Sequence, residues 1–359
     1  MESTDLLIVG AGQSGLAAAH AAREQGLDLL VLDASESTAG SWPRYYDSLA
    51  LFSPARYSAL PAVAMAGDPD RYPSRDEVVS YLEAYGRRFA DDLRLGERVE
   101  SVERFQGEGL IVKTEAGSEY HAGAVIAATG HFGSPFRPNL TGLDSFDGTV
   151  VHSADYISAG PFTGSRTVVV GAGNSAVQIA AELAEQGDVT LATKGGIRWV
   201  SQRPIGRDVH WWLARTGLDT VRTPRLLSRL PASVIDDGRY RSAIAEGAFD
   251  RRPMFDHIEG SDFVWRDGSR ERVDHLILAT GYRPDIPYLS GLGALSRKGM
   301  PLHSGGLSTV VPGLGFVGVE FQRSFSSNTL RGCGRDAAHV VKRLRPVALA
   351  ASRHGLAVA

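Results

Sequence analysis

The same glycine pattern occurs twice in this chain, each time between an apolar run and an alanine-rich stretch. The first copy is LLIVGAGQSGLAAAHAAREQG from Leu6, and the second is VVVGAGNSAVQIAAELAEQG from Val168. The two copies align without a gap. Each predicts a strand, a tight turn and a helix whose N-terminus faces a pyrophosphate. One copy alone is weak evidence because glycine turns before helices are common, but two copies in register predict two dinucleotide sites.

Each glycine of the pattern has a separate task. The first glycine makes the tight turn, the second lets the backbone approach the pyrophosphate, and the third small residue lets the helix pack on the strand. The residues that we predict to line the first cradle are Gly10, Gly12, Gln13, Ser14 and Gly15. Those predicted for the second are Gly171, Gly173, Asn174 and Ser175. The fold class is therefore predicted as α/β, with two Rossmann-like dinucleotide-binding domains.

The residue that ends the second strand of each unit differs between the copies. Asp33 and Lys194 both lie 23 positions after the first glycine of their copy. A carboxylate can accept hydrogen bonds from the ribose hydroxyls of an adenosine, whereas an ammonium attracts a 2′-phosphate. The chain therefore suggests FAD at the first site and NADPH at the second, with NADH also accepted. A surface lysine that merely ends a strand explains Lys194 almost as well.

A shorter repeat follows each fingerprint. VIAATG ends at Gly130 and LILATG ends at Gly281, each about 115 residues after the start of its own fingerprint. Each reads as a buried strand that ends at the nucleotide edge of a doubly wound sheet, where the chain can cross between domains. The residues predicted to lie near the cofactors are Ala128, Thr129, Gly130, Ala279, Thr280 and Gly281.

Composition excludes several other classes of protein. With 359 residues and 43% hydrophobic residues, the chain can fill two or three domain cores. The net charge of -3 is spread along the chain, so no overall field attracts nucleic acid or a membrane. Neither a membrane span nor a signal peptide is evident, which makes a cytoplasmic location the default. The single Cys333 excludes an internal disulfide, a CxxC pair and a cysteine-built metal site, and no metal is predicted.

Several further motifs resemble those of one enzyme family. They are GSW at 40–42, YDSLALFSP at 46–54, FDGTVVHSADY at 146–156 and ATGYRPD from Ala279. Together with the fingerprints they make the whole chain similar to the bacterial flavin-containing monooxygenases. The most specific is the signature FxGxxxHxxxY, whose positions are taken by Phe146, Gly148, His152 and Tyr156. The tyrosine, where Baeyer-Villiger enzymes have tryptophan, indicates the monooxygenase branch proper.

The resemblance implies an NAD(P)H domain inserted into a split FAD domain. The implied ranges are 1–155 and 285–359 for the FAD domain and 156–284 for the NAD(P)H domain. It also implies further cofactor contacts, from Ser41, Trp42, Phe52, Val99 and Gln322. Phe52 belongs to a turn beside the flavin ring, and a helix is expected to begin near Arg335 and Asp336. His152 could hydrogen-bond across the interdomain linker, or could be structural only; no acid or base role is assigned to it.

The chemistry that the resemblance implies belongs mainly to the flavin. NADPH would deliver a hydride, dioxygen would react with the reduced flavin, and the resulting C4a-hydroperoxide would oxygenate a thioether or amine. The expected partners are thus a small substrate and dioxygen. Phe52 departs from the family, because many members carry there an asparagine whose amide helps to protect the peroxide. An NAD(P)H oxidase or reductase with another acceptor is therefore the alternative. Thioredoxin reductase is excluded because the chain has no dithiol.

A redox-sensing flavoprotein without turnover is an alternative from another class. Such a protein would bind FAD, but it has no evident need for the second fingerprint.

The stretch 205–272 carries no motif. Within it, His210, Trp211 and Trp212 could wall a substrate entrance, although buried aromatic packing is the simpler explanation. Arg222, Arg225 and Arg229 have near-helical spacing and predict a solvated face.

Overall fold

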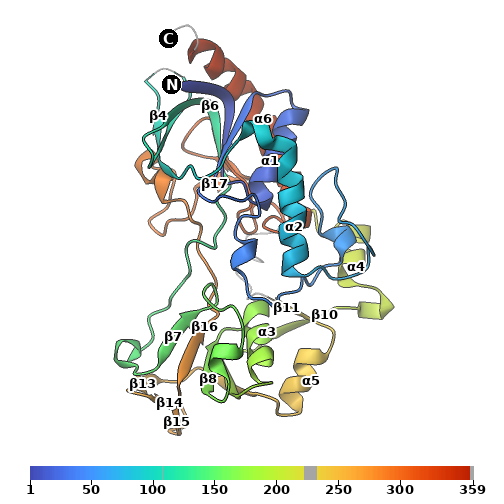
Figure 1. Cartoon of the computed structure of the whole chain (residues 1–359), viewed down its shortest axis with the longest axis vertical. Coiled ribbons are helices and arrows are strands. Elements are labelled where there is room, and N and C mark those ends of the chain that lie inside the picture. Colours follow the sequence, from blue (N-terminus) through green and yellow to red (C-terminus); the bar gives the residue numbers. More distant parts are fainter. Residues whose placement is uncertain (107, 222–232, 356–359) are drawn as a thin grey trace.

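The computed structural model describes residues 1–106, 108–221 and 233–355, with side chains up to 351. The chain forms two domains joined by two adjacent linkers (Figure 1). The first domain contains both ends of the described chain, and the second is inserted between them. The predicted solvated face at Arg222, Arg225 and Arg229 lies outside the described residues.

The first domain is built on a mainly parallel sheet. Its parallel strands follow the order β19 (Leu314–Phe316), β6 (Glu119–Ala127), β1 (Glu2–Val9), β2 (Leu29–Leu32) and β3 (Leu93–Arg94). An antiparallel pair, β17 (His303–Ser304) and β18 (Leu307–Ser308), extends the sheet beyond β19. Two further strands, β4 (Val99–Arg104) and β5 (Leu110–Thr114), branch from β6. β5 pairs antiparallel with both β6 and β4, so the three strands form an antiparallel meander.

Alternating side chains of β1 fill two separate cores, one on each face of this sheet. Leu6 and Ile8 pack with the helices α1 (Gln13–Glu24), α2 (Arg75–Gly86) and α6 (Leu330–Gly355). Leu7 and Val9 pack on the opposite face, against the β4–β5 meander. A strand whose side chains are buried on both faces reads as a continuous apolar run, which is why LLIV was recognisable in the sequence.

The inserted domain repeats this plan. Its parallel sheet has the order β12 (Asp250–Pro253), β9 (Asp188–Thr193), β8 (Arg166–Val170), β16 (His275–Leu278) and β7 (Thr149–His152). One face packs on α3 (Asn174–Leu183) and α5 (Arg239–Ala245), and the other on the antiparallel strands β13 (His257–Glu259), β14 (Asp262–Val264) and β15 (Arg270–Arg272). A pair of parallel strands, β10 (Arg198–Ser201) and β11 (Ser233–Asp236), and the helix α4 (Val209–Thr216) complete it.

Short 3-10 turns connect these elements; they are η1 (Trp42–Arg44), η2 (Ala55–Tyr57), η3 (Arg87–Asp92), η4 (Leu143–Ser145), η5 (Gly160–Phe162), η6 (Pro204–Gly206) and η8 (Pro287–Leu292).

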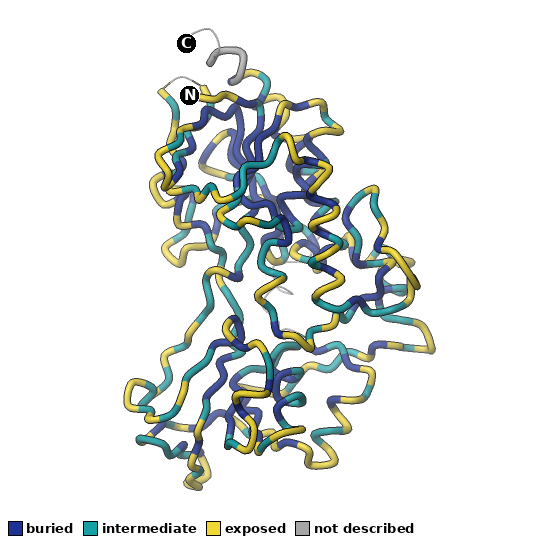
Figure 2. Tube along the Cα trace, in the orientation of Figure 1, coloured by how far each residue is buried: buried dark blue, intermediate teal, exposed yellow. Residues whose placement is uncertain are grey.

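Buried residues run through the centre of each domain, while the linkers are mostly half-buried (Figure 2). The fold confirms the α/β class and the two Rossmann-like units. In both sheets the fingerprint strand lies between the strand that follows it and the ATG strand.

Two details differ from the sequence-based expectation. β7 lies before residue 155, yet it pairs with β16 in the inserted sheet, so the inserted domain begins earlier than the predicted boundary. The signature at 146–156 thus belongs to this domain, because its apolar residues pair beside the ATG strand. The C-terminal helix begins at Leu330 rather than near Arg335 and Asp336.

Candidate functional site

Both fingerprint turns are closed by the same backbone contacts. Gly10 donates to the carbonyl of Leu32 at 2.7 Å, and Gly171 donates to that of Ala192 at 3.1 Å. Gly10 has a φ of +106°, which only glycine adopts easily. A Cβ atom at Gly10 would lie 2.7 Å from the carbonyl oxygen of Ala128, and one at Gly171 would lie 2.4 Å from that of Ala279. In each unit the backbone carbonyl of the ATG alanine therefore leaves no room for a side chain at the first glycine.

The helices that follow the two turns start without a side-chain cap. Gly12 and Gly173 are the N-cap residues of α1 and α3, and neither helix receives a side-chain hydrogen bond there. Elsewhere, Ser74 and Glu77 form a capping box at α2, and Asp208 caps α4. The N-cap of α5 is Gly238, which has no side chain, but Asp236 and Asp237 accept from the first three amides of that helix. Because uncapped N–H groups are donors for an anion, both cradles fit a pyrophosphate.

The residues that end the second strands are in different environments. The Asp33 carboxylate accepts hydrogen bonds from the backbone N–H groups of Ala11, at 2.5 Å, and Ser35, at 2.8 Å. It is thereby held against the first fingerprint turn. Lys194 is exposed directly after β9. Next to it, Arg251 from β12 donates to the carbonyl of Gly195 at 3.2 Å, which brings a second cation to this edge. Sequence reasoning missed Arg251, because nothing local indicates that β12 pairs with β9.

Gln13 and Trp42 connect the first fingerprint to distant segments. The indole nitrogen of Trp42 donates to Oε1 of Gln13 at 3.2 Å, and Nε2 of Gln13 donates to the carbonyl of Asn328 at 2.9 Å. Ser41 is the residue immediately before η1, next to Trp42 in the chain. Ser14 is buried, and a Cβ at Gly318 would lie 2.2 Å from its hydroxyl oxygen. Residues 318–328 therefore pack close to the start of α1.

The other predicted cofactor residues differ in burial and in hydrogen bonding. Val99 is the first residue of β4, next to an irregularity in its pairing with β5. Gln322 is buried; its Oε1 accepts from the N–H of Val319 at 3.3 Å, and its Nε2 has no partner among the described residues. Asn174 uses its side chain to bind the backbone of β11, at Ser233 and Ile235. Ser175, the next residue of α3, is half-buried.

The two ATG motifs join the linkers. The Thr129 hydroxyl donates to the carbonyl of Asp285, and the Thr280 hydroxyl donates to that of Phe136. Phe136 in turn donates its N–H to the carbonyl of Gly281 at 2.9 Å. Each threonine thus holds the opposite linker. Gly130 accepts from Asp285 in the same region.

His152 of the signature is fully buried, and its Nε2 has no hydrogen-bond partner among the described residues. Its Nδ1 accepts a hydrogen bond from the N–H of Ala154 at 3.1 Å, and its ring lies edge-on to Tyr282, with 5.2 Å between the ring centroids. Burial lowers the pKa of His152, which favours the neutral ring. Because Tyr282 belongs to the return linker, His152 packs against that linker.

Phe52 contacts residues of the inserted domain. Its carbonyl accepts from Nε2 of Gln202 at 3.1 Å, and its ring stacks on that of His210, with 6.1 Å between the ring centroids. His210 is buried, while Trp211 and Trp212 are half-buried and perpendicular to each other. Buried packing fits His210 better than a substrate entrance does, and its Nδ1 is in addition hydrogen-bonded to Asp208 at 2.8 Å.

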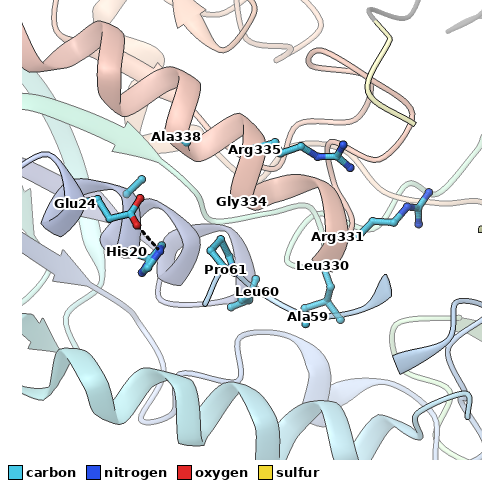
Figure 3. Close-up of a pocket in the computed structure, with 11 residues that line it drawn as sticks. His20, Glu24, Ala59, Leu60, Pro61, Leu330, Arg331, Gly334, Arg335 and Ala338 are labelled. Carbon is cyan, nitrogen blue, oxygen red and sulfur yellow. Dashed lines mark ion pairs between the residues drawn. The ribbon is translucent and has the colours of Figure 1, made fainter. Parts of the chain in front are cut away.

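A hollow of about 280 Å³ lies beside α1, α6 and residues 59–61 (Figure 3). It is lined by His20 and Glu24 from the later turns of α1, away from the fingerprint glycines. Arg331 and Arg335 border it, but their guanidinium groups point away from it and pair with Asp219. The hollow is therefore separate from the two cradles.

Comparison with known proteins places the chain among flavoenzymes. Residues 7–213 match the sequence model of the pyridine nucleotide-disulphide oxidoreductase family. An uncharacterized oxidoreductase, CzcO-like, from Geobacillus kaustophilus is 31% identical over 340 residues, which cover 94% of this chain and 97% of the relative. The flavin-containing monooxygenase from Stenotrophomonas maltophilia has a structure that superposes with a TM-score of 0.85, at 32% identity over 96% of this chain and 99% of that one. The chain belongs to the flavin-containing monooxygenase family.

A plant member of the flavin-containing monooxygenase family is similar over a shorter part. Indole-3-pyruvate monooxygenase YUCCA1 from Oryza sativa subsp. japonica is 31% identical over 331 residues, which cover 82% of this chain and 81% of that protein. The present family member is thus a flavin-dependent oxidoreductase of the monooxygenase type.

Burial raises the pKa of its single thiol, Cys333, to about 12. Within the described residues, no helix is long and apolar enough to span a bilayer.

Proposed function

We propose that this protein is an FAD-dependent monooxygenase that prefers NADPH and oxygenates a soft nucleophile, such as a thioether or an amine. The observation that carries the proposal is the pair of uncapped helix starts at Gly12 and Gly173, one in each domain. Asp33 beside the first cradle suits an adenosine ribose, and exposed Lys194 beside the second suits a 2′-phosphate. Two cradles in one chain let a reductant and a flavin bind together.

FAD, when bound, would supply hydride acceptance and the activation of dioxygen. The first-domain residues that would hold it are those of the Gly10–Gly15 turn, with Trp42 and Gln13 beside it. In the second domain, the Gly171–Ser175 turn, Lys194 and Arg251 would hold NADPH. Phe52 would exclude water from one side of the flavin ring, because its own ring is apolar. The protein's share of the chemistry is thus binding, orientation and dryness.

The structure also favours incomplete coupling. Within the turn expected beside the flavin, Phe52 offers an apolar ring, and its backbone carbonyl already accepts from Gln202. No side-chain amide stands at this position to hold a reactive oxygen species. We therefore propose that part of the NADPH is consumed in the formation of hydrogen peroxide. An NAD(P)H oxidase or reductase is the second candidate, and the same observation supports it.

Anaerobic reduction tests the cofactor assignment. Purified protein reconstituted with FAD would be mixed without oxygen with NADPH and, separately, with NADH, while the flavin absorbance is followed. We expect NADPH to bleach the flavin faster at low coenzyme concentration, and NADH to do so only at higher concentration. A protein that binds no FAD, or whose flavin neither coenzyme reduces, would contradict the proposal.

A further inference from the structure

Asp208 is the centre of a partly buried hydrogen-bond cluster between the two domains. Its Oδ1 accepts from the backbone N–H of His210 at 2.8 Å and from the ring Nδ1 of His210 at 2.8 Å. Its Oδ2 accepts from the Tyr72 hydroxyl at 2.6 Å and from Nε2 of Gln202 at 2.7 Å. Burial alone would raise the pKa of Asp208, but these hydrogen bonds outweigh burial and hold the pKa at about 2. The carboxylate is therefore ionised and fully satisfied.

The ionised carboxylate fixes the tautomer of His210. A carboxylate can only accept, so Nδ1 must carry a proton, and the tautomer with a proton on Nε2 alone is excluded. This Nε2 is buried and has no hydrogen-bond partner among the described residues. The ring is roughly parallel to two aromatic rings of the first domain, with centroid distances of 6.1 Å to Phe52 and 6.3 Å to Tyr57.

Packing alone does not explain a histidine here. A buried nitrogen without a partner costs stability, and a phenylalanine would fill the same space beside Phe52 and Tyr57 without that cost. What the imidazole adds is the Nδ1 hydrogen bond to Asp208. The hydrogen bond to Asp208 thus fixes the orientation of the His210 ring, which a phenylalanine ring would lack.

Two separate attachments lead from Asp208 to Phe52. Gln202 uses its one amide nitrogen to donate both to Asp208 and to the carbonyl of Phe52, at 2.7 and 3.1 Å. His210 is bonded to Asp208 and stacks on the Phe52 ring. Gln202, Asp208 and His210 belong to the inserted domain, whereas Phe52 belongs to the first. The backbone and the ring of Phe52 are therefore both held from the other domain.

We propose that Asp208 and His210 are positioning residues that hold Phe52 in place from the nicotinamide-binding domain, so that the turn at 51–54 is ordered only when the two domains are correctly docked. The proposal rests on the proposed function in one respect, namely that this turn flanks the flavin. Neither residue needs to touch the reacting atoms. Their loss would loosen Phe52, admit water and direct more of the reduced flavin toward hydrogen peroxide.

Hydrogen exchange of the cofactor-loaded protein tests the positioning directly. Asp208→Asn replaces the Oδ2 acceptor by a donor that faces the donors of Tyr72 and Gln202, and His210→Phe keeps a ring but removes the Nδ1 hydrogen bond. The matched control is Asp219→Asn. Asp219 is a buried carboxylate that likewise joins the inserted domain to the first, but through Arg331 and Arg335 and not through Phe52.

We expect amides of residues 51–58 to exchange about tenfold faster in Asp208→Asn and in His210→Phe, and at the parent rate in Asp219→Asn. The ratio of hydrogen peroxide to NADPH consumed should rise about twofold in the first two variants only. Unchanged exchange in His210→Phe, or an equal increase in Asp219→Asn, would overturn the positioning role. Faster exchange as expected in a protein that never forms an oxygenated product would support the positioning role and would reject the monooxygenase function instead.

Discussion

At the scale of single residues, the glycines of the first cradle separate two requirements. Gly15 has no room for any side chain, because a Cβ there would lie 1.6 Å from the carbonyl oxygen of Gly10. At Gly12, by contrast, a Cβ would meet only the Cα of Gly40, at 3.4 Å, which the fold can accept. Gly15 is thus required for the packing of the helix on the strand. Gly12, by contrast, is not required by the fold, and we expect a bound pyrophosphate to be the group that needs the space beside it.

Gly12→Ala should therefore fold but lose FAD. The added methyl group stands where the pyrophosphate must come close to the backbone, and we expect the Kd for FAD to rise at least about tenfold. Flavin content after purification and titration of the apoprotein would measure it. Gly291→Ala, at a position with nothing within 4 Å, is the control. The assignment of the first site fails if Gly12→Ala retains FAD as tightly as the parent protein.

Lys194→Ala should change the choice of coenzyme. Because Lys194 is exposed, its attraction to a 2′-phosphate is screened, and we expect the KM for NADPH to rise about tenfold while the KM for NADH hardly changes. Steady-state kinetics with both coenzymes would show the difference. An equal effect on the two coenzymes would mean that Lys194 lies away from the 2′-phosphate.

At the scale of elements, α4 depends on the charge of its capping residue. The pKa of Asp208 falls from 3.8 to about 2 on folding, so its contribution to stability is present above pH 4 and is lost as the pH falls through 2. Asp208→Asn should therefore be less stable than the parent protein at pH 5, by on the order of 2 kcal/mol, and the difference should shrink toward pH 2. Urea unfolding at several pH values would show this. A difference that is independent of pH would argue against an ionised cap.

The linkers depend on their two threonines. Thr129→Val and Thr280→Val each remove one hydrogen bond to a carbonyl of the opposite linker, and each should cost about 1 kcal/mol in the free energy of unfolding. Thr163→Val removes two hydrogen bonds, to Gly160 and to Gln186, but both are exposed to water, so it should cost less. Denaturant midpoints of the three variants would test the order. If Thr163→Val were the most damaging, the linker contacts would not have the importance given to them.

Many elements of this fold could be predicted from local sequence, and the elements that could not be predicted were missed for physical reasons. The fingerprints and ATG strands were evident because glycine spacing and apolar runs are local signals. The start of α6 was missed, since Gly332 and Gly334 disfavour a helix in isolation. Their lack of side chains is needed, however, because a Cβ at either would meet Ser326 or Pro61 within 2.5 Å. The bond from Tyr72 to Asp208 joins residues 136 positions apart, and no local pattern reports it.

At the scale of the whole molecule, the repeated cradle has a simple explanation. Each sheet brings its fingerprint turn and its ATG alanine to the same edge, and the linkers leave from that edge. Two such edges joined by short linkers can present two nucleotides to each other. Phe52 and His210 stack on each other across the two domains, and we expect this contact to keep water from the flavin and its substrate.

The central claim is that electrons from NADPH reach dioxygen and that one oxygen atom enters a substrate. The most direct measurement is product stoichiometry with isotopically labelled dioxygen, in which sulfoxide and hydrogen peroxide are counted against the NADPH consumed. We predict labelled sulfoxide from small aryl thioethers in less than the amount of NADPH used, with hydrogen peroxide making up the balance. An absence of labelled product across a broad panel of thioethers and amines, together with fast reduction of quinones or dyes, would contradict the monooxygenase function and identify a reductase.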